Sequence, residues 1–118
     1  MRRNKFNVST TKRGKEDRTV DGIVFMSKKE MKRYVELKQL EKEKKIKNLQ
    51  LQPRFLLQDK FVDNQGEKHR KIEYVADFQY KKSGKIYVED SKGMKTDVYK
   101  IKKKLLLFKY KEFIFIES

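Results

Sequence analysis

The pattern of apolar and polar residues along the chain predicts two helices and four main strands. Residues 27–46 (SKKEMKRYVELKQLEKEKKI) carry apolar residues at helical spacing, and Ser27 with Glu30 three positions later forms a capping box. Residues 96–111 repeat the helical period, with Thr96 as the expected N-cap. Apolar runs bounded by turn residues predict strands at 49–62, 71–80, 85–90 and 112–117.

The order of these elements is helix, three strands, helix and strand. Asp21-Gly22 adds a small hairpin before the first helix. The helix between the third and fourth strands can act as a crossover, which allows a parallel strand pair. We therefore expect an α/β (α+β) fold, with a mixed sheet of about four strands and helices on its faces. Residues 1–18 are basic without periodicity and predict a flexible arm, so residues 19–118 form the single expected domain.

The second predicted helix has two apolar faces. We expect one of them to pack on the core, and it consists of Val98, Ile101, Leu105 and Phe108. The other face consists of Tyr99, Lys103, Leu106 and Tyr110. This second face has three interpretations: a solvated surface, a DNA contact through Tyr99 and Lys103, or a homodimer interface through Leu106, Leu107 and Tyr110.

Charge changes the picture from fold to partner. The chain of 118 residues has 32 Lys and Arg against 17 Asp and Glu, a formal net charge of +15. Such a surplus favours a polyanionic partner, and nucleic acid is the leading candidate; the alternative is a lysine-rich surface without a partner. The chain has no cysteine, which excludes disulfides and thiolate sites and fits a reducing cytoplasm. No apolar run has the length of a membrane helix, so we expect no membrane partner.

The hairpin of residues 71–90 carries the candidate chemistry. If its turn centres on Ser83-Gly84, Asp77 lies directly opposite Asp90. Lys92 shares a strand face with Asp90, whereas Glu89 and Ser91 point to the other face. Opposed carboxylates destabilise a sheet unless they share a proton or hold a cation. The pattern indicates either a salt-bridged sheet edge or a site for a hard divalent cation.

Three further residues can be assessed as contributors to this site. Glu30 falls inside the apolar face of the first helix and should point inward, as a site residue or only as the capping box. Gln52 precedes Pro53 and either reaches the site or a phosphate, or is a plain strand residue. His69 is the one histidine of the chain; it lies in a polar loop and is not expected to take part.

An aspartate opposed to the triplet Asp90-Ser91-Lys92 resembles the signature of the PD-(D/E)xK nuclease superfamily. The element order from residue 27 to 117 resembles that superfamily's core, and Glu30 resembles its helix acid. One departure is Ala76, which stands where the signature has proline. More narrowly, the pattern DGIVFMSKKE…LQPRFLL…YVADFQY…VEDSKGMKT is similar to a family of small phage and prophage proteins of formerly unknown function.

The resemblance implies a restriction-endonuclease-like core and a metal site. It implies Mg²⁺ or Mn²⁺ bound by Asp77, Asp90, the carbonyl of Ser91 and Glu30, with Lys92 positioning the attacking water. Residues expected to contact DNA are Arg33, Gln52, Lys95, Thr96, Tyr99 and Lys103. The implied function is that of a phage-type endodeoxyribonuclease in recombination, replication or packaging, with duplex or branched DNA as its substrate. It would act in the bacterial host cytoplasm, and as a homodimer if it cuts symmetrically. The alternatives are a nucleic-acid-binding protein without catalysis, and a nuclease of RNA or of nucleic-acid ends.

Overall fold

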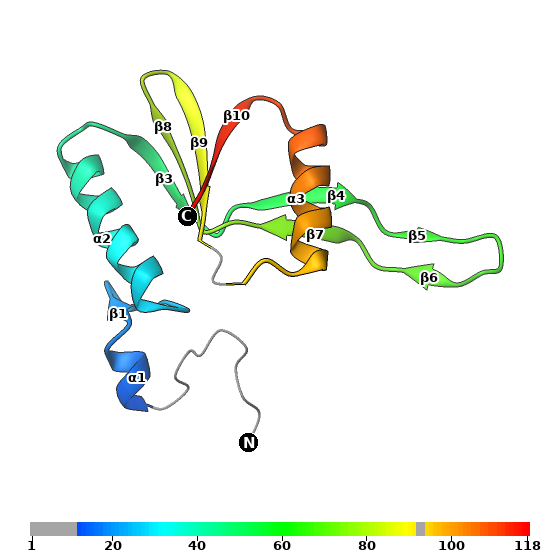
Figure 1. Ribbon diagram of the computed structural model, residues 1–118, viewed down its shortest axis with the longest axis horizontal. Helices are drawn as coiled ribbons and strands as arrows, with labels where there is room; N and C mark the ends of the chain where they lie inside the picture. Colours follow the sequence, from blue (N-terminus) through cyan, green and yellow to red (C-terminus); the bar gives the residue numbers. More distant parts are fainter. Residues whose placement is uncertain (1–11, 92–93) are drawn as a thin grey trace.

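The computed structural model describes residues 12–91 and 94–118 of the chain. Its centre is a mixed four-stranded sheet in the order β10-β9-β8-β3, formed by β3 (Lys47–Leu51), β8 (Phe78–Lys82), β9 (Lys85–Asp90) and β10 (Phe113–Glu117). Helices α2 (Lys28–Lys42) and α3 (Asp97–Lys109) lie on either side of it, as Figure 1 shows. The predicted α+β class and the four-stranded mixed sheet are confirmed.

The register of the sheet follows the turn chemistry of the sequence. Strands β8 and β9 are antiparallel, with Phe78 opposite Glu89 and Lys82 opposite Lys85. Ser83 and Gly84 have φ values of 52° and 75°, as the mirror-image turns of tight hairpins require. Strand β10 pairs parallel to β9 after the α3 crossover. The predicted turn centre and the predicted parallel pair are therefore both confirmed.

The N-terminal part begins with α1 (Lys12–Glu16), followed by a hairpin of β1 (Thr19–Val20) and β2 (Ile23–Val24). The turn residues Asp21 and Gly22 have φ values of 54° and 75°, which confirms the predicted hairpin. Within the arm predicted over residues 1–18, residues 12–16 are helical and Arg18 is buried. The Arg18 Nε donates to the Phe25 carbonyl at 2.8 Å. Residues 1–11 lie outside the described part.

Helix α2 starts as predicted and ends earlier than predicted. Ser27 is its N-cap, and the Ser27 hydroxyl accepts from the Glu30 backbone N–H at 3.1 Å. The helix stops at Lys42 instead of continuing to residue 46. Lys44 adopts a left-handed conformation (φ 61°), and the chain then turns so that Ile46 is buried against the core.

Two predicted strands are interrupted, the first into three pieces and the second into two, and the interruptions at Gln52 and Ala76 lie side by side. The run 49–62 becomes the end of β3, then β4 (Arg54–Gln58) and β5 (Phe61–Val62). The run 71–80 becomes β7 (Ile72–Val75) and the start of β8. Gln52 has a φ of 49° and precedes Pro53, which cannot donate to a sheet ladder. The two breaks are joined by backbone bonds from Gln52 N to the Asp77 carbonyl and from Ala76 N to the Pro53 carbonyl.

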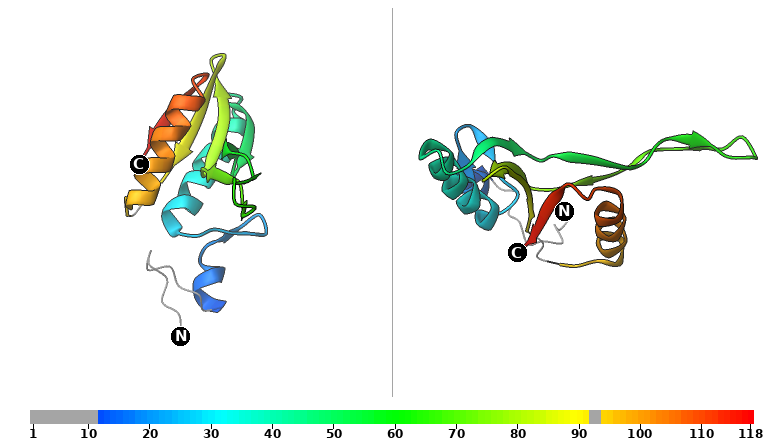
Figure 2. Two further views of the ribbon diagram at one scale, coloured as in Figure 1. Left: turned by 90° about the vertical axis from the view of Figure 1, so that its right-hand side faces the viewer. Right: turned by 90° about the horizontal axis from the view of Figure 1, so that it is seen from above.

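Beyond the breaks, the chain forms a protruding ribbon. Strands β4 and β7 pair antiparallel, and β5 pairs with β6 (Lys68–His69) at the tip. Figures 1 and 2 show this ribbon extending away from the sheet, with α3 against the β4–β7 part only. Phe61 and Val62, at 44% and 61% exposed, reflect the lack of cover at the tip. The sequence pattern does not distinguish this ribbon from the central strands.

The core consists of two clusters on opposite faces of the sheet. The cluster under α2 contains Phe25, Tyr34, Leu37, Ile46, Phe78 and Tyr80. The cluster under α3 contains Tyr74, Ala76, Val88, Tyr99 and Leu106. Because successive strand residues alternate in direction, Glu89 contacts Tyr80 of the first cluster, whereas Asp90 contacts Tyr74 of the second.

The predicted orientation of α3 is wrong. Tyr99 and Leu106, placed on the second face by the pattern, are 8% and 0% exposed. The stripe predicted for the core is in solvent, with Val98 63%, Ile101 61%, Leu105 43% and Phe108 75% exposed. The physical reason lies in the polar ends of the inward residues. Tyr99 donates to Glu117, Tyr110 donates to the Leu56 carbonyl at 2.9 Å, and Lys103 donates to Glu117 at 3.1 Å.

Candidate functional site at the ends of β8 and β9

Asp77 and Asp90, predicted to lie opposite each other, come directly next to the last residue pair of the central hairpin. Phe78 pairs with Glu89, which places Asp77 and Asp90 in the next register position. The Asp77 backbone N–H donates to the Glu89 carbonyl at 3.0 Å. The Ser91 N–H donates to the Asp77 carboxylate at 2.7 Å. The Asp77 side chain is therefore held against the end of β9.

Asp90 is held from the α3 face of the sheet. It is 1% exposed, and it accepts a hydrogen bond from the Tyr74 hydroxyl. Burial, and then the hydrogen bond to Asp90, raise the pKa of Tyr74 well above its ordinary value, so Tyr74 remains a donor at neutral pH. Sequence reasoning missed Tyr74; its signal is its placement three residues before Asp77 in an apolar strand.

Glu89 faces α2, as the alternation of strand residues predicts. The Arg33 guanidinium donates two hydrogen bonds to the Glu89 carboxylate, from Nε to Oε1 at 2.8 Å and from Nη2 to Oε2 at 2.7 Å. The Tyr80 hydroxyl also donates to the Glu89 carboxylate. Burial alone would raise the pKa of Glu89, but the bonds from Arg33 and Tyr80 hold it below its ordinary value. The bond to Glu89 in turn raises the pKa of Arg33.

Glu30 enters from the first turn of α2 and is buried, at 7% exposed. This confirms its inward direction, and its backbone also takes part in the predicted cap. Glu30 lies on the α2 face, the face of Glu89, whereas Asp90 packs toward α3. The two acids therefore reach the strand ends from opposite faces of the sheet.

A pocket of about 360 Å³ lies at this end of the sheet. Its acidic lining residues include Glu30, Asp77, Glu89 and Asp90, and Ser91 also lines it. Three basic residues of α2 lie at its walls: Lys29, Lys32 and Arg33. The pocket thus combines carboxylate oxygens with cationic side chains, which are the groups needed to bind a phosphate next to a hard cation.

The C-terminal strand brings one more acid to this end of the sheet. Glu117 pairs with Asp90 in the parallel register of β10 and β9. It accepts hydrogen bonds from Tyr99, from Lys95 at 3.0 Å and from Lys103 at 3.1 Å. The bonds from Tyr99 and Lys95 lower the pKa of Glu117 to about 2. No sequence signal identified Glu117, because the offset between parallel strands is set by the crossover and not by a local turn.

The residues expected to contact DNA differ in how exposed they are and in whether they are already bonded to other side chains. Tyr99, expected to contact DNA, is buried, and its hydroxyl donates to Glu117. Lys95 and Lys103 are paired with Glu117, and Arg33 is paired with Glu89. Thr96 is the N-cap of α3 and accepts from the Tyr99 N–H at 3.1 Å. Gln52 is exposed and holds Asp77 through its backbone N–H. Lys92, expected to position water, lies outside the described residues.

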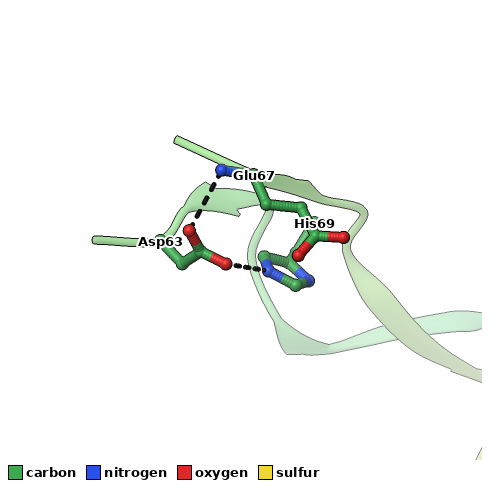
Figure 3. A group of neighbouring side chains, drawn as sticks. All are labelled: Asp63, Glu67 and His69. Atoms are coloured by element: carbon green, nitrogen blue, oxygen red, sulfur yellow. Dashed lines mark hydrogen bonds and ion pairs between the residues drawn. The ribbon is translucent and has the colours of Figure 1, made fainter. Parts of the chain in front are cut away.

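A second group of metal-ligating side chains lies at the tip of the ribbon. Asp63, Glu67 and His69 each place one ligand atom within 4.8 Å of the others, the one such group of three in the described ranges. Figure 3 shows the His69 ring against the Asp63 carboxylate, at 2.8 Å, and the bond from the Glu67 N–H to Asp63 at 3.0 Å. The Gln65 N–H also donates to Asp63, at 2.8 Å. These bonds explain Asp63 as the residue that closes the turn.

Within the described parts of the chain, no helix combines the length and the apolar character needed to cross a membrane. No curated protein and no solved structure matches this sequence. A family model does match, over residues 10–116, which include the whole sheet and both long helices except the last residue of β10. The chain therefore belongs to the family described as protein of unknown function, DUF1064.

Proposed function

We propose that the protein is a metal-dependent endodeoxyribonuclease that hydrolyses phosphodiester bonds at the ends of β8 and β9. The observation that carries the proposal is that Asp77 and Asp90 adjoin the last β8–β9 pair, Phe78 and Glu89, and line one pocket together with Glu30. Opposed carboxylates repel each other in a sheet, and a bound hard cation is one way in which a fold offsets that repulsion. The resemblance to the PD-(D/E)xK signature supports the same interpretation.

The donor set fits a hard divalent cation. The carboxylates of Asp77 and Asp90 and the carbonyl of Ser91 are all oxygen ligands, which Mg²⁺ and Mn²⁺ prefer. A bound Mg²⁺ would polarise a phosphodiester oxygen and lower the pKa of a water molecule. The protein itself keeps Asp77 in place through the Ser91 N–H and keeps Asp90 in place through Tyr74. Glu30 is the additional acid available from α2.

The cationic residues near the pocket would bind the substrate backbone. Lys29 and Lys32 line the pocket and are exposed, so they can meet phosphates without losing a protein partner that fixes the fold. Arg33 serves the site indirectly, because its guanidinium is occupied by Glu89. Lys92 is proposed to position the attacking water on the strength of the resemblance. The net charge of +15 favours association of the chain with DNA.

The proposal is tested with purified protein, Mg²⁺ and a panel of substrates: supercoiled plasmid, linear duplex, four-way junction, single strand and RNA. We expect cleavage of DNA by the wild type, and loss of at least about 100-fold in Asp90→Asn and in Lys92→Ala, since even outer-shell changes cost up to that factor. Asp59→Asn is the matched control, because Asp59 is an exposed acid of the ribbon. A wild type that cleaves nothing on the panel, or an Asp90→Asn variant with full activity, contradicts the proposal.

The second candidate is a nucleic-acid-binding protein without catalysis. It is favoured by the positive charge and by the protein partners that the strand-end acids already have, Arg33 for Glu89 and Tyr74 for Asp90. Such a protein would bind DNA as tightly or more tightly after Asp90→Asn and would show no Mg²⁺-dependent cleavage. Cleavage confined to RNA or to linear ends would instead identify a ribonuclease or an end-specific nuclease.

A further inference from the structure

The exposed face of α3 is a row of large apolar side chains that the described parts of the chain leave largely open, apart from Lys111 Nζ, which lies 5.5 Å from the centre of the Phe108 ring. Val98, Ile101, Leu105 and Phe108 are 43% to 75% exposed, and we call them the α3 stripe. Their spacing of three, four and three residues is that of a coiled-coil seam. Figures 1 and 2 show α3 packed against the β4–β7 ribbon and β10 on one side only. Four exposed apolar side chains in one row are typical of an interaction surface.

The sequence of the stripe is symmetric about position 103. Val98 and Phe108 lie five residues on either side of that position, and Ile101 and Leu105 lie two residues on either side. Two copies of α3 packed antiparallel, with their position 103 at the same level, therefore align Val98 with the other copy's Phe108 and Ile101 with its Leu105. All four stripe residues then find an apolar partner. This is the self-complementarity that a two-fold interface requires.

The charges at the ends of α3 are symmetric in the same way. Asp97 is the acid of the first turn and Lys109 the base of the last turn, six residues on either side of position 103. In an antiparallel pair, the acidic end of each helix lies beside the basic end of the other, and the two helix dipoles oppose. A parallel pair would bring two Asp97 carboxylates together. The charge pattern therefore selects the antiparallel arrangement.

We propose that a second copy of this chain covers the α3 stripe, through an antiparallel α3–α3 contact on a two-fold axis. Nucleic acid is a poorer occupant, because the centre of the stripe is apolar and its lysines, Lys102 and Lys104, lie at the edges. These lysines can bury their methylene stems and keep their charges in solvent. The proposal does not rest on nuclease activity, since the stripe and the strand-end pocket share no residue.

The first experiment measures mass in solution over a wide concentration range, by light scattering and sedimentation. We expect the apparent mass to rise from the chain value of 14.4 kDa to twice that value. The double variant Ile101→Ser, Leu105→Ser should raise the dissociation constant at least about tenfold, as loss of central apolar anchors does. Val35→Ser is the control, because Val35 is an exposed aliphatic residue on α2. Helical content by circular dichroism should be unchanged in both variants.

Salt separates this association from DNA binding. Added salt screens the lysines at the edges of the contact, so dimerisation should hold or strengthen, whereas binding to DNA should weaken steeply. A wild type that stays monomeric at all concentrations overturns the proposal. So does a dimer that persists in the double variant. A monomeric wild type whose DNA affinity falls in the double variant identifies the stripe as a nucleic-acid surface instead.

The second experiment tests the antiparallel orientation with disulfides, which is clean because the chain has no cysteine. Chains with Ile101→Cys and chains with Leu105→Cys are mixed and oxidised. Disulfides form only between close Cα atoms, and the antiparallel pair places position 101 of one copy beside position 105 of the other. We therefore expect more of the mixed product, which joins one chain of each variant, than of either product that joins two identical chains. A preference for the products of two identical chains contradicts the antiparallel arrangement. Val35→Cys is the control for random collision.

Discussion

Two groups of acids in this molecule are similar in composition and differ in how they are held. At the ends of β8 and β9, Glu89 and Asp90 are buried, and their partners come from other elements: Arg33 of α2 and Tyr74 of β7. At the ribbon tip, Asp63 is held by residues of its own turn and its neighbouring strand. The strand-end acids depend on the whole fold, and the tip acid depends on a turn. The acids that we propose as the functional site are thus the ones held by the tertiary structure.

The largest effect on stability should come from Glu89→Ala. The change removes the partner of the Arg33 guanidinium and of the buried Tyr80 hydroxyl. A broken buried ion pair costs about 3–5 kcal/mol, and partial exposure of Arg33 reduces the expected loss of unfolding free energy to about 2–4 kcal/mol. Urea denaturation measures it. Glu36→Ala is the matched control, because Glu36 contacts the same Arg33 at 3.3 Å from an exposed position and should change stability by less than about 1 kcal/mol.

A smaller loss is expected for Tyr74→Phe. This change leaves the ring packed in the core and removes the hydroxyl that donates to the buried Asp90. Loss of a donor to a buried acceptor costs about 1–3 kcal/mol. Thermal and urea unfolding would measure this loss of unfolding free energy. Tyr87→Phe is the control, because Tyr87 lies on the face of β9 opposite to that of Asp90. An unfolding free energy equal to that of wild type would show that Asp90 does not depend on Tyr74.

Glu117 should make stability depend on pH. Its pKa is about 2 in the folded chain against 4.5 for an ordinary glutamate, so the unfolded chain binds the proton first as pH falls. The stabilisation is complete above pH about 4.5 and is lost as pH falls toward 2. Wild type and Glu117→Gln should therefore differ most in unfolding free energy near neutral pH and converge in acid. A gap independent of pH would contradict the pairing of Glu117 with Lys95 and Lys103.

The smallest effect should come from Asp63→Asn at the ribbon tip. Asp63 is bonded within the turn and to His69, so its loss loosens the tip without reaching the core. We expect a change in unfolding free energy below about 1 kcal/mol and unchanged DNA cleavage. Local hydrogen exchange at Gln65 and Glu67 should rise, because a neutral amide oxygen accepts their N–H groups more weakly than the carboxylate does. A large loss of cleavage would place the function at the tip.

The parts of the fold that the sequence predicted are those with local causes. Neighbouring residues determine two tight turns and one helix cap, at Asp21-Gly22, Ser83-Gly84 and Ser27. The Asp21-Gly22 turn forms the N-terminal hairpin, and the Ser83-Gly84 turn sets the register of β8 against β9. The same local reasoning gave the inward direction of Glu30. These features survive because no distant contact competes with them.

The parts that the sequence did not predict depend on distant partners. Apolar spacing alone could not choose between the two faces of α3; the choice follows from Glu117 and the Leu56 carbonyl, which accept the hydrogen bonds of Tyr99, Lys103 and Tyr110. The strand breaks at Gln52 and Ala76 also depend on a distant segment, because the backbone N–H of each residue donates to a carbonyl beside the other break. Arg33 was expected on DNA, and only the tertiary structure shows its pairing with Glu89.

The peptide group between Asp90 and Ser91 ties three strands together. Its N–H donates to the Asp77 carboxylate and its carbonyl accepts from the Ser118 N–H, so both ends of one rigid plane are bonded to neighbouring segments. A plane fixed at both ends cannot rotate without breaking two bonds at once. Deuterium should therefore enter the Ser91 amide far more slowly than a position at the mouth of a pocket would suggest. Its exchange rate would report the opening of the whole strand end as a single cooperative event.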